Sequence, residues 1–210
     1  MTVLKFEDLR AAMRATDRDE RLVIMPLLDR EQVGSSSVDL RLGSEFLLLR
    51  RTRRAGLDPA AGQIGRHVAE MQDRVTVPLG EGLWLHPGQF VLGSTLEFVR
   101  VPPTMAATVE SRSSWGRWGL TVATATPVHP GYSGNLTLEL INNGESPIRL
   151  LPGLRITQLV VHRLTGKTSK PYDRRTAGYF FPVGPEAGQS AWEEAELEAV
   201  MAVGRRLLPK

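Results

Sequence analysis

Cysteine is absent from the 210 residues of this chain. Disulfides, thiolate nucleophiles, iron–sulfur clusters and cysteine-ligated zinc are therefore excluded. Histidine is scarce as well, and its four copies stand far apart, at His67, His86, His129 and His162. None of them lies in an HxxxH or HxE pattern, which would bring two ligands to one metal. We therefore expect no catalytic transition metal bound by the protein.

Long apolar runs are also missing. No run approaches the roughly 18 residues that span a bilayer. The N-terminal sequence MTVLKFEDLR lacks the charged-then-apolar order of a signal peptide. We therefore expect a cytoplasmic protein that does not contact a membrane. The net charge of +3, from 26 basic and 23 acidic residues, is too small to indicate nucleic-acid binding but suits an anionic small molecule.

The composition is that of an ordinary globular protein, since apolar residues make up 41% and charged residues 23% of the chain. Between residues 75 and 161, short strand-like stretches are separated by turn residues such as Pro87-Gly88, Pro130-Gly131 and Asn143-Gly144. Strands at this spacing with no helix between them predict a sandwich or barrel, either a jelly roll or a relative of it.

Fewer elements are predicted outside that region. Residues 5–16 show the apolar spacing of a short amphipathic helix. Residues 37–42 and 45–49 alternate as two strands do. The polar stretch 50–74 has no clear periodicity, which predicts a loop that leaves the sheet. A patch that binds phosphate or nucleic acid through its arginines is the alternative.

The C-terminal region differs from the rest, because Ser190 and Glu193 fit a capping box and apolar residues follow at helical spacing. We therefore expect a β-barrel domain over residues 1–185 and a helical extension over residues 186–210.

The segment Glu110-Ser111-Arg112-Ser113-Ser114-Trp115-Gly116-Arg117 combines two arginines, three serines and a glycine. Forked guanidinium donors, hydroxyls and backbone N–H groups are what a phosphate chain requires. The alternative is that the serines cap the following turn and the arginines lie in solvent.

Glu139 lies in a predicted strand over residues 135–142. Period-two alternation sends Leu136, Leu138 and Leu140 to one face, and places Glu139 with Thr137 and Ile141 on the other. The carboxylate lies either on a wet outer face or in a pocket. In a pocket, desolvation would raise its pKa toward the range useful for proton transfer.

The order of motifs resembles that of the dCTP deaminase family, within the dUTPase-like superfamily, over roughly residues 5–185. The matching pieces are SSSVDLRLG (35–43), HPGQFVLGSTLE (86–97), ESRSSWGRWGL (110–120), ATA (123–125), HPGYSGNLTLELINNG (129–144), PIRLLPGLRITQL (147–159) and KPYDRR (170–175).

The resemblance implies a mainly β fold, a distorted jelly-roll β-barrel of the dUTPase-like type with short peripheral helices at both termini. It implies a homotrimer whose active sites lie between subunits. The implied reaction is hydrolytic, zinc-independent deamination of dCTP to dUTP and ammonia, with Mg²⁺ serving only to chelate the triphosphate. The missing cysteines agree with this, because zinc-type deaminases need a CxxC and an HxE.

The resemblance also implies roles for individual residues. Glu139 matches the catalytic glutamate, which takes a proton from the attacking water and delivers it to the cytosine ring. Arg117 matches the arginine that polarises this water, and Ser113 the hydroxyl beside it. The other positions match substrate-binding residues: Arg112 and Ser114 in the phosphate cradle, Thr124 and Ala125 at the pyrimidine edge, and Gln158 and Tyr172 at the phosphates or the closing C-terminal arm.

Two positions depart from the family pattern. His129 stands where the family and the related triphosphatases carry an aspartate, which in the triphosphatases activates water against the α-phosphate. Downstream, Tyr179 is kept but the neighbouring lysine that grips the triphosphate is not. Besides dCTP deamination, two alternatives therefore stay open. One is a dUTP pyrophosphatase or bifunctional deaminase and pyrophosphatase, with His129 as a further substrate-binding candidate. The other is a non-catalytic nucleotide-binding regulatory trimer.

Overall fold

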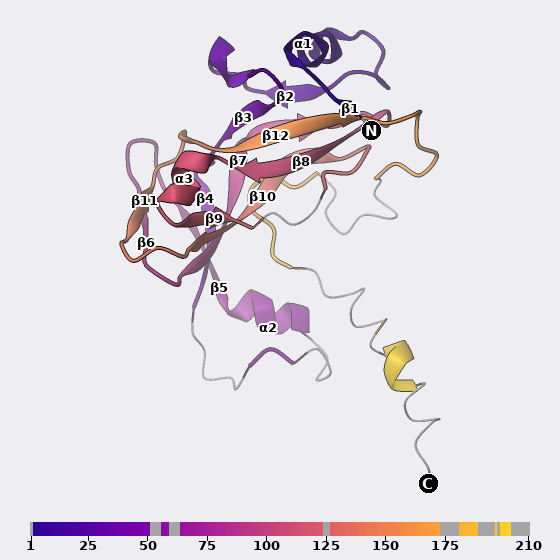
Figure 1. Ribbon diagram of the computed structural model, residues 1–210. Helices are drawn as coiled ribbons and strands as arrows, with labels where there is room; N and C mark the ends of the chain where they lie inside the picture. The colour runs from indigo at the N-terminus through magenta and orange to yellow at the C-terminus, as the bar shows by residue number, and fades with distance from the viewer. Residues whose placement is uncertain are drawn as a thin grey trace. The chain divides into compact units, whose positions relative to one another are not determined.

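The computed structural model describes residues 2–50, 56–58, 64–123, 127–172, 181–188, 196 and 198–202. Strands take up far more of the described chain than helices do (Figure 1), which confirms the prediction of a mainly β fold. The chain divides into two compact units. The first comprises Met1–Leu47 and Arg74–Glu186, and the second comprises Leu48–Asp73 and Ala187–Lys210.

The strands, in chain order, are β1 (Thr2–Val3), β2 (Val23–Met25), β3 (Val38–Arg41), β4 (Glu45–Leu49), β5 (Gln72–Thr76), β6 (Leu83–Leu85), β7 (Phe90–Arg100), β8 (Met105–Ser111), β9 (Leu120–Val122), β10 (Ser133–Asn142), β11 (Ile148–Leu150) and β12 (Arg155–Arg163). The helices are α1 (Phe6–Arg14), η1 (Arg30–Gln32), α2 (Ile64–Glu70) and α3 (Ser113–Arg117).

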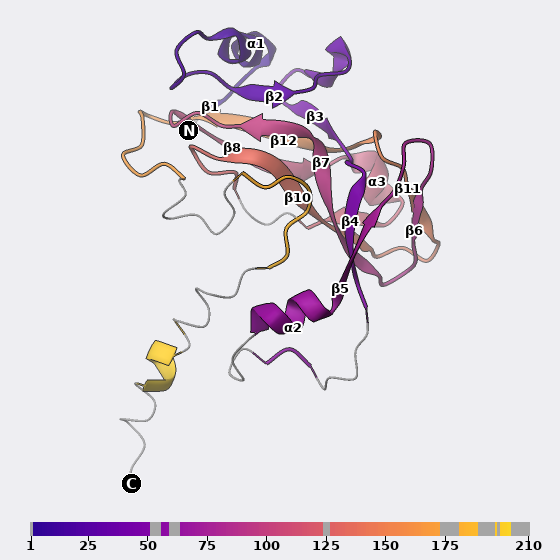
Figure 2. The same cartoon turned by 180° about the vertical axis from the view of Figure 1, so that it is seen from behind.

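The strands form three sheets. In the first, β12 pairs with β1 and β3 and also with β8, all antiparallel. The second has the order β5-β4-β7-β10-β9, with β2 also paired to β7. The third joins β6 to β11. Figure 2 shows β12 and β8 side by side from behind. Because β12 pairs with β3 along one edge and with β8 along the other, it positions the site described below.

Alternation along the strands builds the core. On β10, Leu138 and Leu140 are fully buried, while Glu139 between them is exposed. This confirms the predicted faces of that strand. Fully buried leucines from β3 and β12 join the core, including Leu40 and Leu159. Burying each such side chain contributes about 1.5–3 kcal/mol to folding.

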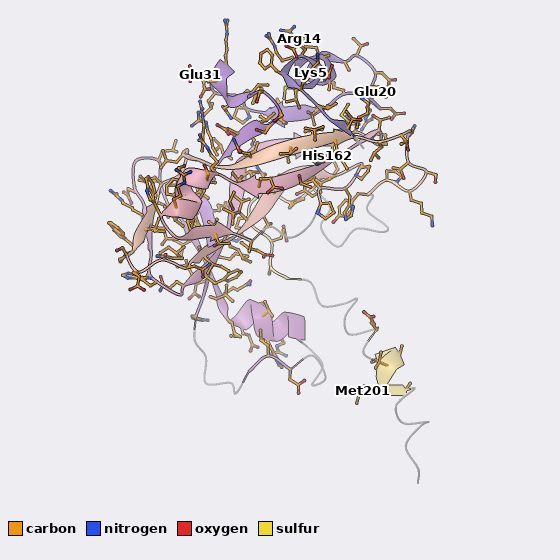
Figure 3. All side chains as sticks on the ribbon, viewed as in Figure 1. Lys5, Arg14, Glu20, Glu31, His162 and Met201 are labelled. Atoms are coloured by element: carbon orange, nitrogen blue, oxygen red, sulfur yellow. The ribbon has the colours of Figure 1, made fainter. Side chains whose placement is uncertain are left out.

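The predicted N-terminal helix is confirmed as α1. Its Leu9 and Ala12 are buried, whereas Arg14 and Lys5, the residue just before the helix, are exposed (Figure 3). The predicted strand over 45–49 is confirmed as β4. Of the expected C-terminal helix, residues 198–202 are helical, while Ser190 and Glu193 lie outside the described residues.

The prediction of a loop over residues 50–74 is wrong in part. Residues 64–70 form α2, and β5 begins at Gln72 and enters the sheet beside β4. The strand was missed because its exposed and half-buried positions do not alternate. Within this stretch, the N–H of Arg50 donates to the C=O of Met71 at 2.9 Å, which closes the base of the excursion with a backbone hydrogen bond.

Glu97 on β7 is fully buried and joins β7 to β3 and η1. One carboxylate oxygen accepts a hydrogen bond from the N–H of Arg41 at 2.8 Å, and the other accepts from Nε2 of Gln32 at 2.9 Å. The same Gln32 nitrogen donates to the C=O of Asp39 at 3.1 Å. Burial raises the pKa of Glu97 above its ordinary value. Glu97 thereby holds β3 on both sides of Leu40.

Glu97→Gln should lower the free energy of unfolding by about 1–3 kcal/mol, because an amide offers one oxygen to two buried donors and one donor loses its acceptor. Urea unfolding at neutral pH measures the loss. Glu7→Gln on α1 is the matched control, since Glu7 makes only an exposed pair with Lys5. Such a pair contributes little. Equal stability of the two variants would contradict this role of Glu97.

Candidate active site

The segment that follows β8 forms α3, and one tryptophan fixes its orientation. Trp115 is buried, and its indole Nε1 donates to the C=O of Arg155 at 2.9 Å, at the first residue of β12. With Trp115 turned inward, Ser113, Ser114 and Arg117 are all exposed. Their hydroxyls and guanidinium therefore face away from the core on one short helix.

The alternative in which the serines cap this turn is not what the structure has. Arg112 occupies the N-cap position without a side-chain cap, and its C=O accepts from the N–H groups of Trp115 and Gly116 at 3.1 and 3.2 Å. Within the described part of the chain, the hydroxyls of Ser113 and Ser114 make no hydrogen bond. Both hydroxyls are therefore available to a ligand.

Glu139 occupies the exposed face of β10, opposite Leu92 of β7. Its C=O accepts from the N–H of Ala123 at 2.8 Å, so the segment after β9 follows the strand at this point. Although the side chain is exposed, nearby protein atoms remove part of its hydration, and this desolvation raises its pKa. Among the described residues, its carboxylate has no hydrogen-bond or ion-pair partner, and neither Arg117 nor Ser113 contacts it within this chain.

Arg112 and Gln158 do come together, through a residue that sequence analysis did not assign. Gln158 faces Asp39 across the β12–β3 pairing, and its Nε2 donates to Oδ1 of Asp39 at 3.0 Å. Nη1 of Arg112 lies 3.5 Å from Oδ2 of the same carboxylate. The signal in the sequence was Asp39 itself, an acidic residue between the core residues Val38 and Leu40, which is the pattern that singled out Glu139.

His129 and Tyr172 are also brought together. Their rings stack with centroids 5.8 Å apart and planes inclined by 14°. Tyr132 packs on the same tyrosine at 5.8 Å, and the N–H of Tyr172 donates to the C=O of Pro130 at 2.6 Å. Burial raises the pKa of Tyr132. The start of the C-terminal arm, at Tyr172, is therefore held by aromatic packing. Thr124, Ala125 and Tyr179 lie outside the described residues.

Residues 181–186 of the arm lie along β10. The N–H of Asn135 donates to the C=O of Pro182 at 2.9 Å, and the N–H of Glu186 donates to Oγ1 of Thr137 at 3.2 Å. Thr137 shares the exposed face of β10 with Glu139 and lies two residues before it. The arm thus contacts the strand two residues before Glu139, the residue that the family resemblance places in the catalytic role.

Residues outside β10 also hold residues 181–186 of the arm. Arg74 donates to the carboxylate of Glu45 at 2.7 Å and to the C=O of Pro185 at 3.3 Å. The rings of Phe98 and Phe181 stack with centroids 6.2 Å apart. These contacts fix the arm at several points of the first unit.

Metal-ligating side chains do not gather in threes anywhere in the described ranges. Nor does any described helix have the length and hydrophobicity to cross a membrane.

A family model described as dCTP deaminase-like matches residues 7–164. The chain belongs to this family. The resemblance predicted from the motifs is thereby confirmed.

Curated members of the dCTP deaminase-like family match most of the chain. A "dCTP deaminase, dUMP-forming" of Methanobrevibacter smithii is 41% identical over 172 residues, which are 80% of this chain and 87% of that protein. A "dCTP deaminase" of Halorubrum lacusprofundi is 45% identical over 172 residues, covering 80% of this chain and 83% of that protein.

A solved structure of the dCTP deaminase-like family also resembles the chain, the 2′-deoxycytidine 5′-triphosphate deaminase of Agrobacterium tumefaciens. The two agree with a TM-score of 0.56 at 26% identity, over 76% of this chain and 47% of that one. The present chain thus spans about half the length of that structure. The likeness confirms the predicted distorted jelly roll of the dUTPase-like type, although the described strands form three sheets rather than one closed barrel.

The close approach of the arm to Gly134 can be tested by substitution. Gly134 has φ of +150°, and a Cβ added there would lie 2.3 Å from Cδ of Pro182. Gly134→Ala should therefore displace the arm. Hydrogen exchange should accelerate at the amides of Asn135 and Glu186, which lose their partners.

Gly80→Ala is the control for backbone strain alone, because Gly80 has φ of +89° but open space around its Cβ position. Unchanged exchange at Asn135 and Glu186 in Gly134→Ala would show that this glycine does not seat the arm.

Proposed function

We propose that this protein hydrolyses dCTP to dUTP and ammonia, with Glu139 as the proton shuttle. The observation that carries the proposal is the state of Glu139 within a chain that belongs to the dCTP deaminase-like family. It is a carboxylate of raised pKa, without a partner among the described residues, on the face of β10 that the arm contacts at Thr137. A carboxylate whose pKa is raised toward the working pH can both accept and return a proton.

The proposed chemistry needs one water and no redox partner. Glu139 takes a proton from the water as its oxygen bonds to C4 of cytosine, and delivers that proton to the ring. The proton of the new C4 hydroxyl then passes through Glu139 to the amino group, the C4–N bond breaks as C4=O forms, and ammonia leaves. Arg117 and Ser113 orient the water and the base, while Arg112, Ser114 and Gln158 bind the phosphates. In this proposal Thr124 and Ala125 contact the pyrimidine edge, and Tyr172 and Tyr179 belong to the closing arm.

The proposed site is completed by a neighbouring subunit of a homotrimer. Glu139, Ser113 and Arg117 are all exposed, and within the described part of one chain the carboxylate makes no hydrogen bond or ion pair with either of the other two. A second copy that brings its α3 to Glu139 would desolvate both halves of the site and raise the pKa of the glutamate further.

Mg²⁺ enters the proposal as part of the substrate, chelated by the triphosphate. The described residues supply cations and hydroxyls at α3 rather than a group of carboxylates, and such donors suit phosphate oxygens rather than a metal ion. We place the reaction in the cytoplasm, where free nucleotides are found.

A bifunctional enzyme that releases dUMP is the second candidate. It is favoured by the relatives named dUMP-forming, including that of Methanobrevibacter smithii and that of Dictyoglomus turgidum, which is 39% identical over 174 residues. The position of His129 opposes it, because its ring stacks on Tyr172 and the family's aspartate is absent. Attack on the α-phosphate would then require this imidazole as the base.

Glu139→Gln should lower the deamination rate by about 10²–10⁴ while leaving dCTP affinity within a few fold, because the amide keeps the shape but cannot carry the proton. Products of dCTP and Mg²⁺ are separated by anion exchange. Wild-type protein should yield dUTP, and dUMP would favour the bifunctional enzyme. For wild type, kcat/KM should rise with pH until it passes the raised pKa of Glu139.

Glu7→Gln is the matched control and should turn over like wild type. Residual activity of Glu139→Gln near the wild-type level would refute the role of this carboxylate.

Sites shared between subunits should be restored by mixing two inactive variants. If Glu139→Gln and Arg117→Ala are co-expressed in equal amounts, about a quarter of the sites in random trimers combine an intact glutamate with an intact arginine. Activity should return to that fraction of wild type. No recovery, despite mixed trimers seen by native mass spectrometry, would place both residues in one chain's site.

A further inference from the structure

We infer that Asp39 is a positioning residue for the nucleotide, which holds Arg112 and Gln158 where they meet the phosphates. The inference rests on the proposed function and adds to it a residue that does not touch the substrate. Arg112 comes from the end of β8, Gln158 from β12 and Asp39 from β3, so the three meet only because β12 pairs with both other strands.

The carboxylate of Asp39 is nearly buried, with 11% of its side chain exposed. Oδ1 accepts from Gln158, and Oδ2 lies 3.4 Å from Nη1 of Arg155 and 3.5 Å from Nη1 of Arg112. The two arginine contacts are longer than the 2.7–2.9 Å or so of a strong charge-assisted hydrogen bond. Asp39 thus orients Arg112 through one nitrogen, and the other donors of its guanidinium have no hydrogen-bond partner among the described residues.

The ion pairs around Asp39 leave Arg112 the least neutralised cation. Asp29 is bound tightly by Arg155 at 2.6 Å and by Arg41 at 2.5 Å. Arg155 also shares Asp39, so three guanidinium groups divide two carboxylates among them. Arg112 has the longest of these contacts and the most exposed side chain of the three arginines, at 33%. The surplus positive charge therefore lies at the edge of the cluster that faces α3.

Further hydrogen bonds to Asp39 and Arg155 hold this cluster of ion pairs in place. The C=O of Asp39 accepts from Gln32, which also donates to the buried Glu97. Arg155 fixes α3 through its backbone, since its C=O accepts from Trp115. An anion at α3 would therefore meet a cation whose position is set before binding, which lowers the cost of ordering it.

Asp39→Asn and Asp29→Asn make the same change in charge but should differ in their effect on the binding of an anion. Each removes one negative charge from the cluster, which by itself would strengthen the binding of an anion. If Asp39 positions Arg112 and Gln158, Asp39→Asn should instead weaken the binding of inorganic tripolyphosphate about tenfold. Asp29→Asn should leave it unchanged or tighter. Isothermal titration calorimetry measures both, without any need for turnover.

A double variant tests whether Asp39 acts on phosphate binding through Arg112. The double variant Asp39→Asn/Arg112→Gln should lose less affinity for tripolyphosphate than the two single losses added together, because the part of Asp39 that acts through Arg112 is already gone, whereas a general loss of structure would add in full. In turnover, Asp39→Asn should raise KM for dCTP with kcat within a few fold, because uniform binding is lost. If Asp39→Asn does not fold, Asp39→Glu, which keeps the charge but moves it by one methylene, should weaken tripolyphosphate binding at least threefold.

Several results would overturn the inference. Equal or tighter tripolyphosphate binding by Asp39→Asn would mean that Asp39 competes with the phosphate, and wild-type affinity in Asp39→Glu would mean that its position is unimportant. In both cases dCTP turnover by the wild type would still stand. If the wild type binds neither tripolyphosphate nor dCTP, the proposed function falls together with the inference.

Discussion

The pairing of β12 with β3 on one side and β8 on the other is the constraint on which the candidate site depends. Through it, Gln158 lies opposite both Asp39 and Glu110, and Ser111 at the end of β8 pairs with Thr157 near the start of β12. The indole of Trp115 then ties α3 to Arg155. A single strand therefore sets the position of the phosphate-binding candidates and of the helix that carries Ser113 and Arg117.

What the sequence predicts well is local. The period of two along β10 places Leu138 in the core and Glu139 on the other face, because neighbouring side chains of a strand point to opposite faces whatever the rest of the fold does. The same reasoning finds β4, and the period of 3.6 finds α1. The order of the motifs identifies the family, and membership of the family implies the jelly roll.

What the sequence does not predict depends on long-range pairing. Asp39 and Gln158 are 119 residues apart, and no periodicity links them. Their contact follows from the β3–β12 register, which is defined only when both strands pack. β5 was missed for a related reason, since it enters the sheet beside β4 without an alternating pattern of its own. That Glu139 has no partner among the described residues was equally beyond reach, because the absence of a partner is a property of the folded surface.

The two departures from the family pattern are His129 in place of an aspartate and the missing lysine beside Tyr179. Both bear on how the arm acts in the proposed site. His129 stacks on Tyr172 where the family carries an acid, and the arm is held at Phe181, Pro182 and Pro185 by ring stacking, close packing and backbone acceptors. In the proposed site, the described arm therefore acts by packing rather than by charge. Among the described residues, neutralisation of the phosphates then depends on the arginines of the α3 region. Arg112 carries much of that work, and a fixed carboxylate behind it matters more than it would in a relative whose arm supplies a lysine.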